Sequence, residues 1–344
     1  MSGATATQAE AVSPAFLAQL DELVALDTVS PLDELRLEGA ERLLAGYGCS
    51  RLGRELFGRG DVGSSTWVYC HLDTKPPVPR TGWETDPFRL TARGDRLHGL
   101  GISDSKFQLL DALLATEQSD CFLLIDTGEE CGGMEAPELL RSHEVETIVV
   151  VDGAVGRFDV YAGLSGQVDG ALRLRTGRSR LHPGRERTSD TDPDLLELID
   201  ALLRDLETKR LRFNLTDIRA AESERSLTLE EADLRFDLRF GTEERETVEA
   251  FVAGYEVEIR QWMEPLEGSE TFEATALSVG PQAPFSSNLG GRGLEPRRVI
   301  VVPGAANDNR AHRPNEFVRL DQIGAHLARL TSVIEAIGVE VHGG

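Results

Sequence analysis

The sequence predicts an α/β fold with a mainly parallel sheet, interrupted by a smaller inserted α+β module. Four short apolar runs have the length of buried strands and cover residues 66–70, 121–125, 147–151 and 298–304. Helical segments separate these runs, as crossover connections between parallel strands do. From 163 to 280 the strands instead alternate apolar and polar residues, which is typical of half-exposed strands.

The helices of the α/β part are predicted from apolar residues at helical spacing. The second of them is ended by Gly46 and Gly48. A Pro- and Gly-rich stretch, 76–87, predicts an irregular loop instead. The helices are expected over residues 14–27, 32–46, about 105–116, 135–142 and 320–337.

The inserted segment predicts a ferredoxin-like module with the order β-α-β-β-α-β. Asp192 and Pro193 are an N-cap residue and a first-turn proline for its first helix. Its helices are expected over 193–207 and 243–252, and its strands over 168–174, within 227–240 and over 271–279. We therefore expect one domain made of residues 1–162 and 281–344, with a second domain, 163–280, inserted into it.

Composition excludes several classes of partner. The formal net charge of −23 disfavours nucleic acid and anionic membranes. No stretch approaches the roughly 18 apolar residues of a membrane span. Residues 1–14 contain no basic residue and no apolar core of a signal peptide, and the four cysteines have no zinc or disulfide spacing. A cytoplasmic location is the expectation.

Residues of metal-ligand type follow the predicted strands or lie on adjoining loops. Each has an ordinary structural alternative, such as a loop histidine, a helix cap or a solvated turn. Their combination at several strand ends is what indicates a site, because ligands gather at the carboxyl ends of parallel strands. These residues are His71, Asp104, Glu129, Glu130, Asp152 and His312.

Carboxylates together with imidazoles suit zinc, manganese or cobalt. Two histidines and three carboxylates suit two ions held about 3.5–4 Å apart. A carboxylate that binds no ion could then act as general base on a water molecule. Asp73, two residues after His71, could orient the imidazole ring.

The motifs resemble those of the dinuclear zinc amidohydrolases, which include acetylornithine deacetylase, succinyl-diaminopimelate desuccinylase, aminoacylase and carboxypeptidase G. Together with Asp152 they follow one another in the order and with the intervals found in such enzymes. They are HLDTKPP at 71–77, GWETDPF at 82–88, GLGISDSK at 99–106, EECG at 129–132 and AHRPNE at 311–316.

The resemblance implies a role for each of these residues. Asp104 would bridge the two ions, and Asp73 would orient His71. Glu129 would deprotonate a water molecule lying between the ions and then protonate the leaving amine. The remaining metal ligands would be His71, Glu130, Asp152 and His312.

In such enzymes the inserted domain is a lid that mediates dimerisation and contributes substrate-binding groups. The resemblance implies that His182 stabilises the oxyanion, in its own subunit or the partner's, and that Arg239 holds a substrate carboxylate. Four substrate-side positions depart from the pattern: Ser226 replaces an asparagine, Phe107 replaces a glycine, and Ser287 with Asn288 stands where threonine and aspartate are usual. These departures put the substrate specificity in doubt, and not the hydrolysis.

The resulting hypothesis is a homodimeric, metal-dependent deacylase of N-acyl amino acids. A dipeptidase or carboxypeptidase, acting on short peptides, uses the same core and stays open, as does deblocking of an acidic amino-group carrier protein. Arginines around His182 could attract an anionic substrate or carrier, or could be a solvated loop. A non-catalytic binding protein and a two-metal phosphoesterase are the rivals from other classes.

Overall fold

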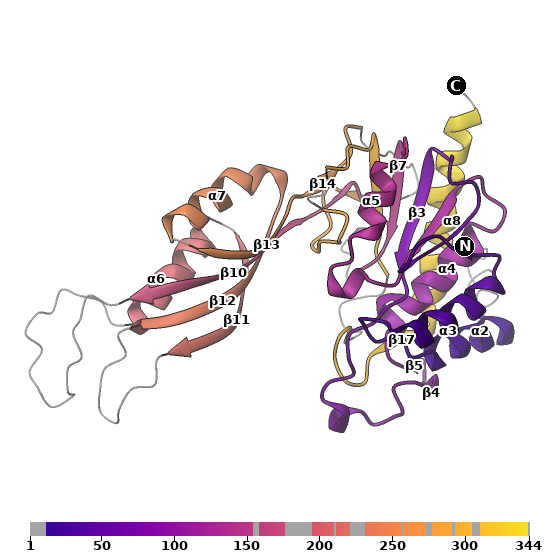
Figure 1. Cartoon of the computed structure of the whole chain (residues 1–344), viewed down its shortest axis with the longest axis horizontal. Coiled ribbons are helices and arrows are strands. Elements are labelled where there is room, and N and C mark those ends of the chain that lie inside the picture. The colour runs from indigo at the N-terminus through magenta and orange to yellow at the C-terminus, as the bar shows by residue number, and fades with distance from the viewer. Residues whose placement is uncertain are drawn as a thin grey trace, which may run out of the picture. The chain divides into compact units, whose positions relative to one another are not determined.

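The structure is a computed structural model. It describes residues 12–153, 158–175, 195–209, 211–220, 231–255, 257–270, 272, 277–290, 293–304 and 310–342. The chain divides into two compact units, which we call the first unit, Met1–Leu164 with Leu266–Gly344, and the second unit, Ser165–Pro265. Figure 1 shows the elements of both.

The first unit is built on a sheet that has eight strands in the described residues, in the order β1-β2-β6-β3-β7-β16-β8-β15. Its central strands β6, β3, β7 and β16 are parallel, and the outer pairs include antiparallel ones. The mainly parallel sheet was therefore predicted correctly. Its strands are β1 (Ser50–Arg51), β2 (Leu56–Arg59), β3 (Thr66–His71), β6 (Phe122–Asp126), β7 (Thr147–Val151), β8 (Val160–Tyr161), β15 (Val279–Gly280) and β16 (Arg298–Val302).

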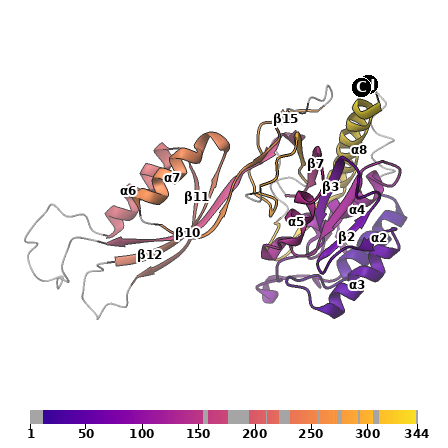
Figure 2. The ribbon, with the colours of Figure 1, turned by 45° about the horizontal axis from the view of Figure 1, so that its top comes forward.

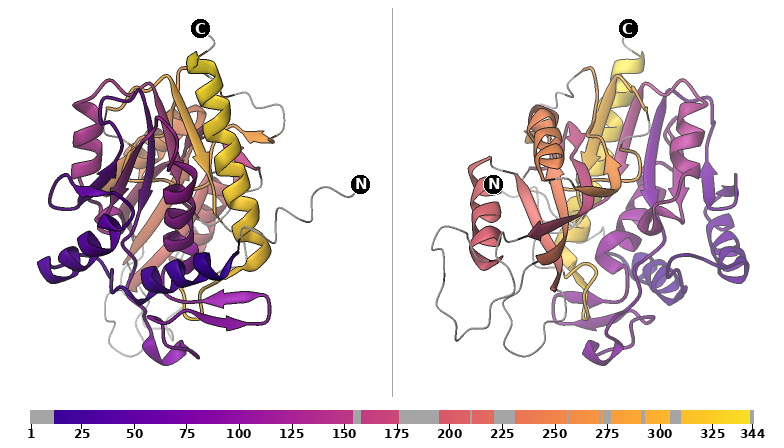
Figure 3. Two further views of the ribbon diagram at one scale, coloured as in Figure 1. Left: turned by 90° about the vertical axis from the view of Figure 1, so that its right-hand side faces the viewer. Right: turned by 60° about the vertical axis from the view of Figure 1, so that its left-hand side comes forward.

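Alternate side chains of the central strands enter two different hydrophobic cores, one on each face of the sheet. Val68 and Val149 pack with the helices α2, α3, α4 and α8, whereas Trp67 and Ile148 pack with α5. Figure 3 shows α8, in yellow, lying along its face of the sheet. The helices are α2 (Pro14–Ala25), α3 (Glu34–Ala45), α4 (Phe107–Ala115), α5 (Glu135–Arg141) and α8 (Leu320–His342). Burial on both faces explains why these strands are continuous apolar runs.

Smaller elements complete the first unit. A three-stranded sheet in the described residues consists of β4 (Thr91–Arg93), β5 (Arg96–His98) and β17 (Phe317–Arg319). The short helices are η1 (Arg80–Gly82), η2 (Ile102–Lys106) and η3 (Glu129–Cys131), and a two-stranded ladder joins β9 (Gly163–Leu164) to β14 (Leu266–Glu267).

The second unit has the ferredoxin-like order β-α-β-β-α-β. Its described strands form an antiparallel sheet in the order β11-β12-β10-β13, and Figure 2 shows α6 and α7 together on one face of it. Alternate residues of β12, from Ala232 to Phe240, form the core against these helices. The elements are β10 (Gly166–Arg175), α6 (Leu195–Thr208), β11 (Arg212–Ala220), β12 (Glu231–Phe240), η4 (Thr242–Glu244), α7 (Arg245–Gly254) and β13 (Glu258–Met263).

The strands of this unit differ from the prediction in two places. We did not predict β11, where a register shift between Leu215 and Asp217 breaks the alternation of apolar and polar residues. The last strand is β13 rather than 271–279. Within 271–279, Val279 begins β15 of the large sheet, and 271 and 273–276 lie outside the described residues.

The C-terminal boundary of the second unit, at Pro265, also differs from the predicted residue 280. Residues from Leu266 onward belong to the first unit, because β14 pairs with β9 and β15 pairs in parallel with β8. Among the described residues, no helix combines the length and the apolar character that crossing a membrane requires.

A buried polar pair links α4 to α8. Asp111 and His326 are both fully buried, and Asp111 Oδ2 lies 2.7 Å from His326 Nδ1. Burial raises the pKa of Asp111 well above its ordinary value and lowers the pKa of His326 to about 3. Both shifts favour the uncharged forms, and the hydrogen bond between Asp111 and His326 pairs one polar atom of each residue inside the core.

Asp111→Ala should lower the free energy of unfolding by about 3 kcal/mol, because it leaves a buried imidazole unpaired beside a new cavity. Asp111→Leu combined with His326→Leu should recover most of that loss, since it removes both polar groups and fills the space. Urea denaturation of the metal-free protein measures both values. A double variant less stable than the single one would contradict this account of the pair.

Candidate metal centre

Parallel strands bring the predicted ligands to one edge of the large sheet. His71 is the last residue of β3, and Asp152 directly follows β7, the strand beside it. On the other side of β3, His71 is in register with Asp126, the last residue of β6. Since the strands β6, β3 and β7 share one direction, their polar ends meet at the same edge.

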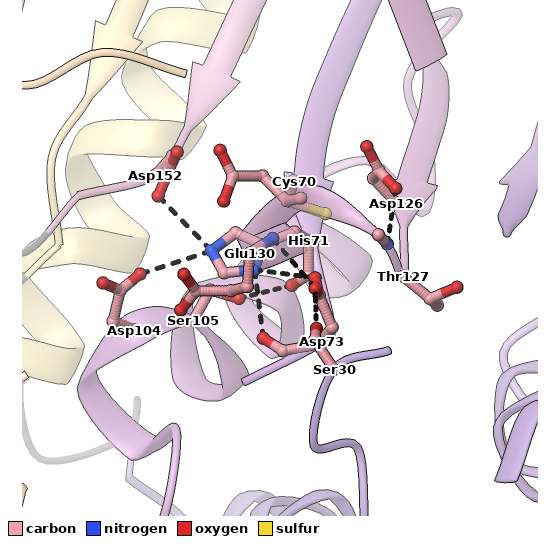
Figure 4. A network of polar contacts seen from close by, with 12 residues as sticks. Ser30, Cys70, His71, Asp73, Asp104, Ser105, Asp126, Thr127, Glu130 and Asp152 are labelled. Carbon is pink, nitrogen blue, oxygen red and sulfur yellow. Dashed lines mark hydrogen bonds and ion pairs between the residues drawn. The ribbon is translucent and has the colours of Figure 1, made fainter. Parts of the chain in front are cut away.

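The carboxylates of Asp104 and Asp152 converge on His71, and we call these three residues the inner group. His71 Nε2 lies 3.3 Å from Asp104 Oδ1 and 3.4 Å from Asp152 Oδ1. Figure 4 shows both carboxylates pointing at the same side of the imidazole ring. The His71 side chain is only 1% exposed, whereas that of Asp104 is 12% exposed.

A second set, the outer group, consists of Asp104, Glu130 and His312. His312 Nε2 lies 3.2 Å from Asp104 Oδ2 and 2.8 Å from Glu130 Oε1. Within each group one ligand atom of every residue lies within 4.8 Å of the others. Asp104 belongs to both groups and offers one oxygen to each.

The charges of the inner and outer groups favour the binding of cations. Burial by itself would lower the pKa of His312, but hydrogen bonds with Asp104 and Glu130 outweigh it and raise that pKa to about 11. For Asp104, burial is likewise outweighed, and hydrogen bonds with the two histidines hold its pKa below the ordinary value. The carboxylates thus draw protons onto the imidazoles, and divalent cations could replace those protons. Carboxylate oxygens and imidazole nitrogens are ligands that zinc, manganese and cobalt accept.

The carboxylate of Asp73 contacts one residue of each group. It is fully buried, and its Oδ1 lies 3.3 Å from His71 Nδ1. Its Oδ2 accepts hydrogen bonds from the backbone N–H of Glu130, at 2.9 Å, and from the Ser30 hydroxyl. A carboxylate in this place fixes the orientation of the imidazole ring and leaves Nε2 to face the ligand side.

Glu129 lies next to the inner group without being one of its ligands. Its half-buried carboxyl is withdrawn from water, which raises its pKa well above the ordinary value, and the neighbouring charge of Asp152 adds to the rise. The backbone N–H of Asn288 donates to Glu129 Oε1 at 3.4 Å. A carboxyl with a raised pKa beside a cation site is suited to take up and release a proton.

Asp104 is held by a residue to which the sequence assigns no role. The buried carboxylate of Glu316 accepts from the backbone N–H groups of Gly101, Ser103 and Asp104 at 2.9, 2.8 and 3.2 Å. Gly101 has a φ of +70°, and a Cβ there would lie 2.2 Å from the Thr74 side chain. The motif AHRPNE contained Glu316, but nothing in the sequence signalled that it reaches across to the turn of Asp104.

The structure brings together His71, Asp73, Asp104, Glu129, Glu130, Asp152, His312 and Asn288 within the first unit. Arg239 belongs to the second unit, where its Nε lies 2.9 Å from Asp237 Oδ1 on the sheet face opposite the helices. His182, its flanking arginines and Ser226 lie outside the described residues. Phe107 is buried and packs edge-on against His326.

Sequence comparison relates the chain to peptidases and deacylases. The family described as Peptidase family M20/M25/M40 matches residues 67–336. Succinyl-diaminopimelate desuccinylase of Bordetella petrii is 36% identical over 111 residues, which cover 30% of this chain and only 29% of that protein. The desuccinylase of Thioalkalivibrio sulfidiphilus is 23% identical over 325 residues, covering 82% of this chain and 86% of the relative.

Structural comparison gives the same fold. An M20 family metallo-carboxypeptidase from Sulfolobus solfataricus has a TM-score of 0.67 at 17% identity, over 94% of this chain and 99% of the other. Human carnosine dipeptidase 1 has a TM-score of 0.60 at 16% identity, over 96% and 97%. The family match extends over most of the chain and includes every ligand of the inner and outer groups, and the chain belongs to Peptidase family M20/M25/M40.

Proposed function

We propose that this protein hydrolyses the amide bond of an N-acyl amino acid with the help of two divalent metal ions. The observation that carries the proposal is the position of Asp104, whose two oxygens face two separate ligand groups. Glu129 beside the inner group supplies a further feature that hydrolysis requires, a carboxyl able to exchange a proton.

The inner group would hold one ion and the outer group the other. Zinc is the first candidate, with cobalt or manganese as alternatives. When bound, such ions increase the acidity of water and polarise an acyl carbonyl. Asp73 would keep the His71 ring in place, as its contact with Nδ1 suggests.

Glu129 would take the proton from the water that attacks the acyl carbon and then deliver it to the leaving amine. Its raised pKa supports both steps, because a general base and acid works best with a pKa near the working pH. We assign the oxyanion contact to His182 on the resemblance alone.

Arg239 is proposed to bind the carboxylate of the substrate. Its guanidinium projects from the face of β12 that is turned away from α6 and α7, in a strand whose core side is fully apolar. Arginine matches a carboxylate with two parallel donors. The second unit is further proposed to mediate a homodimer.

A peptidase is the second candidate, because the solved structures of similar fold include a metallo-carboxypeptidase and a dipeptidase. The experiment that tests the proposal is a screen of acetyl-, succinyl- and glutamyl-amino acids, dipeptides and an acylated carrier protein, with zinc, cobalt or manganese supplied. Hydrolysis of none of these substrates would contradict the proposal.

Glu130→Ala and Glu129→Ala should have different effects although the residues are adjacent. The first removes an outer-group ligand and should lower the bound metal from two ions per chain to one. The second should keep both ions and lower kcat by about 10²- to 10⁴-fold, the usual contribution of a general base. Elemental analysis after dialysis and steady-state kinetics measure these effects.

Glu249→Ala serves as the control for both variants, since Glu249 is an exposed partner of Arg245 on α7. It should leave metal content and kcat unchanged. Unchanged turnover in Glu129→Ala would refute its role as base, whatever the metal content.

Arg239→Gln should raise KM at least about tenfold for substrates that carry a free carboxylate, since a hydrogen-bonded ion pair contributes more than 1.4 kcal/mol. The same substrates with that carboxylate amidated should show no further loss. Arg235→Gln is the matched control, because Arg235 lies four residues away on the same face of β12. Equal effects of the two substitutions would argue against a specific contact.

A further inference from the structure

The inner and outer groups contain the same kinds of ligand atom but have different surroundings. Each offers one imidazole and two carboxylates, and Asp104 is common to both. The groups around them can therefore make their affinities for cations differ. Two such neighbours are present in the structure, and their charges have opposite signs.

The neighbour of the inner group is negative. Asp73 Oδ1 lies 3.3 Å from Nδ1 of His71, on the side of the ring opposite the other ligands. A carboxylate in this place increases the basicity of the imidazole and so strengthens its bond to a cation.

The neighbour of the outer group is positive. Lys75 Nζ lies 3.0 Å from Glu130 Oε2, and it also donates to the backbone carbonyl oxygen of Glu130. The other carboxylate oxygen, Oε1, is the one that faces His312 at 2.8 Å. Of the lysines and arginines in the described residues, Lys75 is the one ion-paired with a carboxylate of either ligand group.

The exposure of the side chains to solvent also differs between the two groups, and the outer group is the more exposed. The side chains of Lys75 and His312 are 43% and 44% exposed, whereas those of His71 and Asp152 are 1% and 8% exposed. An ion in the outer group would therefore be closer to solvent and would have an ammonium group beside one of its ligands. Like charges repel, and repulsion of the ion lowers its affinity.

We propose that Lys75 weakens the outer group for its ion, so that the inner group fills first and the outer group fills only at higher free metal concentration. The inference rests on the proposed two-ion function. Lys75 acts through its contact with Glu130 and is a positioning residue. Its charge would set the fraction of protein chains in which the second ion is bound. Turnover would then depend on the free metal concentration through the occupancy of the outer group.

A purely structural role for Lys75 predicts the opposite effect. If the lysine only holds the loop of Glu130 in place, its removal should weaken the outer ion or destabilise the fold. Lys75→Gln keeps a hydrogen-bond donor and removes the charge, whereas Lys75→Arg keeps both. The two substitutions therefore separate the charge of Lys75 from its hydrogen bonds.

The experiment is isothermal titration of Zn²⁺ into the full-length, chelator-stripped protein, with a competing chelator of known affinity. The wild type should bind two ions in separable steps, and His312→Ala, which removes an outer ligand, identifies the weaker step. Lys75→Gln should tighten that step by about 10- to 100-fold, the range that groups around a metal site produce, and leave the tighter step unchanged. Lys75→Arg should resemble the wild type.

Lys209→Gln is the matched control, because Lys209 forms a comparable ion pair, 2.7 Å from Asp205, in the second unit. It should change neither step. A weaker step that is unchanged or weakened in Lys75→Gln, with two ions still bound by the wild type, would overturn the role of Lys75 alone. A wild type that binds fewer than two ions would overturn the two-ion function and this inference with it.

Discussion

The Asp104 carboxylate is the interaction on which the rest of the centre depends. It stands between two imidazoles that come from opposite ends of the chain, and each of its oxygens faces one of them. Several further carboxylates lie at the same sheet edge, where burial and mutual repulsion would favour their neutral forms. Positive charge offsets this repulsion, as the two histidines do by holding the pKa of Asp104 below its ordinary value.

The fold contributes by holding the acids in place through strand pairing and hydrogen bonds. Parallel strands deliver His71 and Asp152 to one edge, and Glu316 gathers three backbone N–H groups around the turn that carries Asp104. Asp126 holds the start of the loop of Glu129 by accepting from Gly128, and burial raises its own pKa to about 7. A site prepared in this way loses little conformational entropy when an ion binds.

Similar ligands acquire different properties from their neighbours. Glu129 and Glu130 are adjacent in the chain, yet one lies by the inner group with a raised pKa and the other contacts a histidine and a lysine. The same holds for the two ligand groups, one of which has an acid behind it and the other a base beside it. In both cases charges a few ångströms away, rather than the ligand types, distinguish chemically identical groups.

The sequence by itself determined the fold class and the candidate ligands. Apolar runs buried on both faces leave an unmistakable pattern, and polar residues at their ends mark the edge where ligands gather. It did not predict β11, whose alternation is broken by a register shift, or the edge strand β13, whose exposed residues are three consecutive ones. Patterns of burial predict strands only where burial follows a regular period.

Only the tertiary structure decided which distant residues meet. Glu316 lies 213 positions from Ser103, Asp111 lies 215 from His326, and Lys75 lies 55 from Glu130. Buried acids and bases are individually unfavourable, so no local pattern announces them, and they become stable only when a partner from another element arrives. Local sequence records the preferences of short segments, whereas the pairing of charges depends on the path of the whole chain.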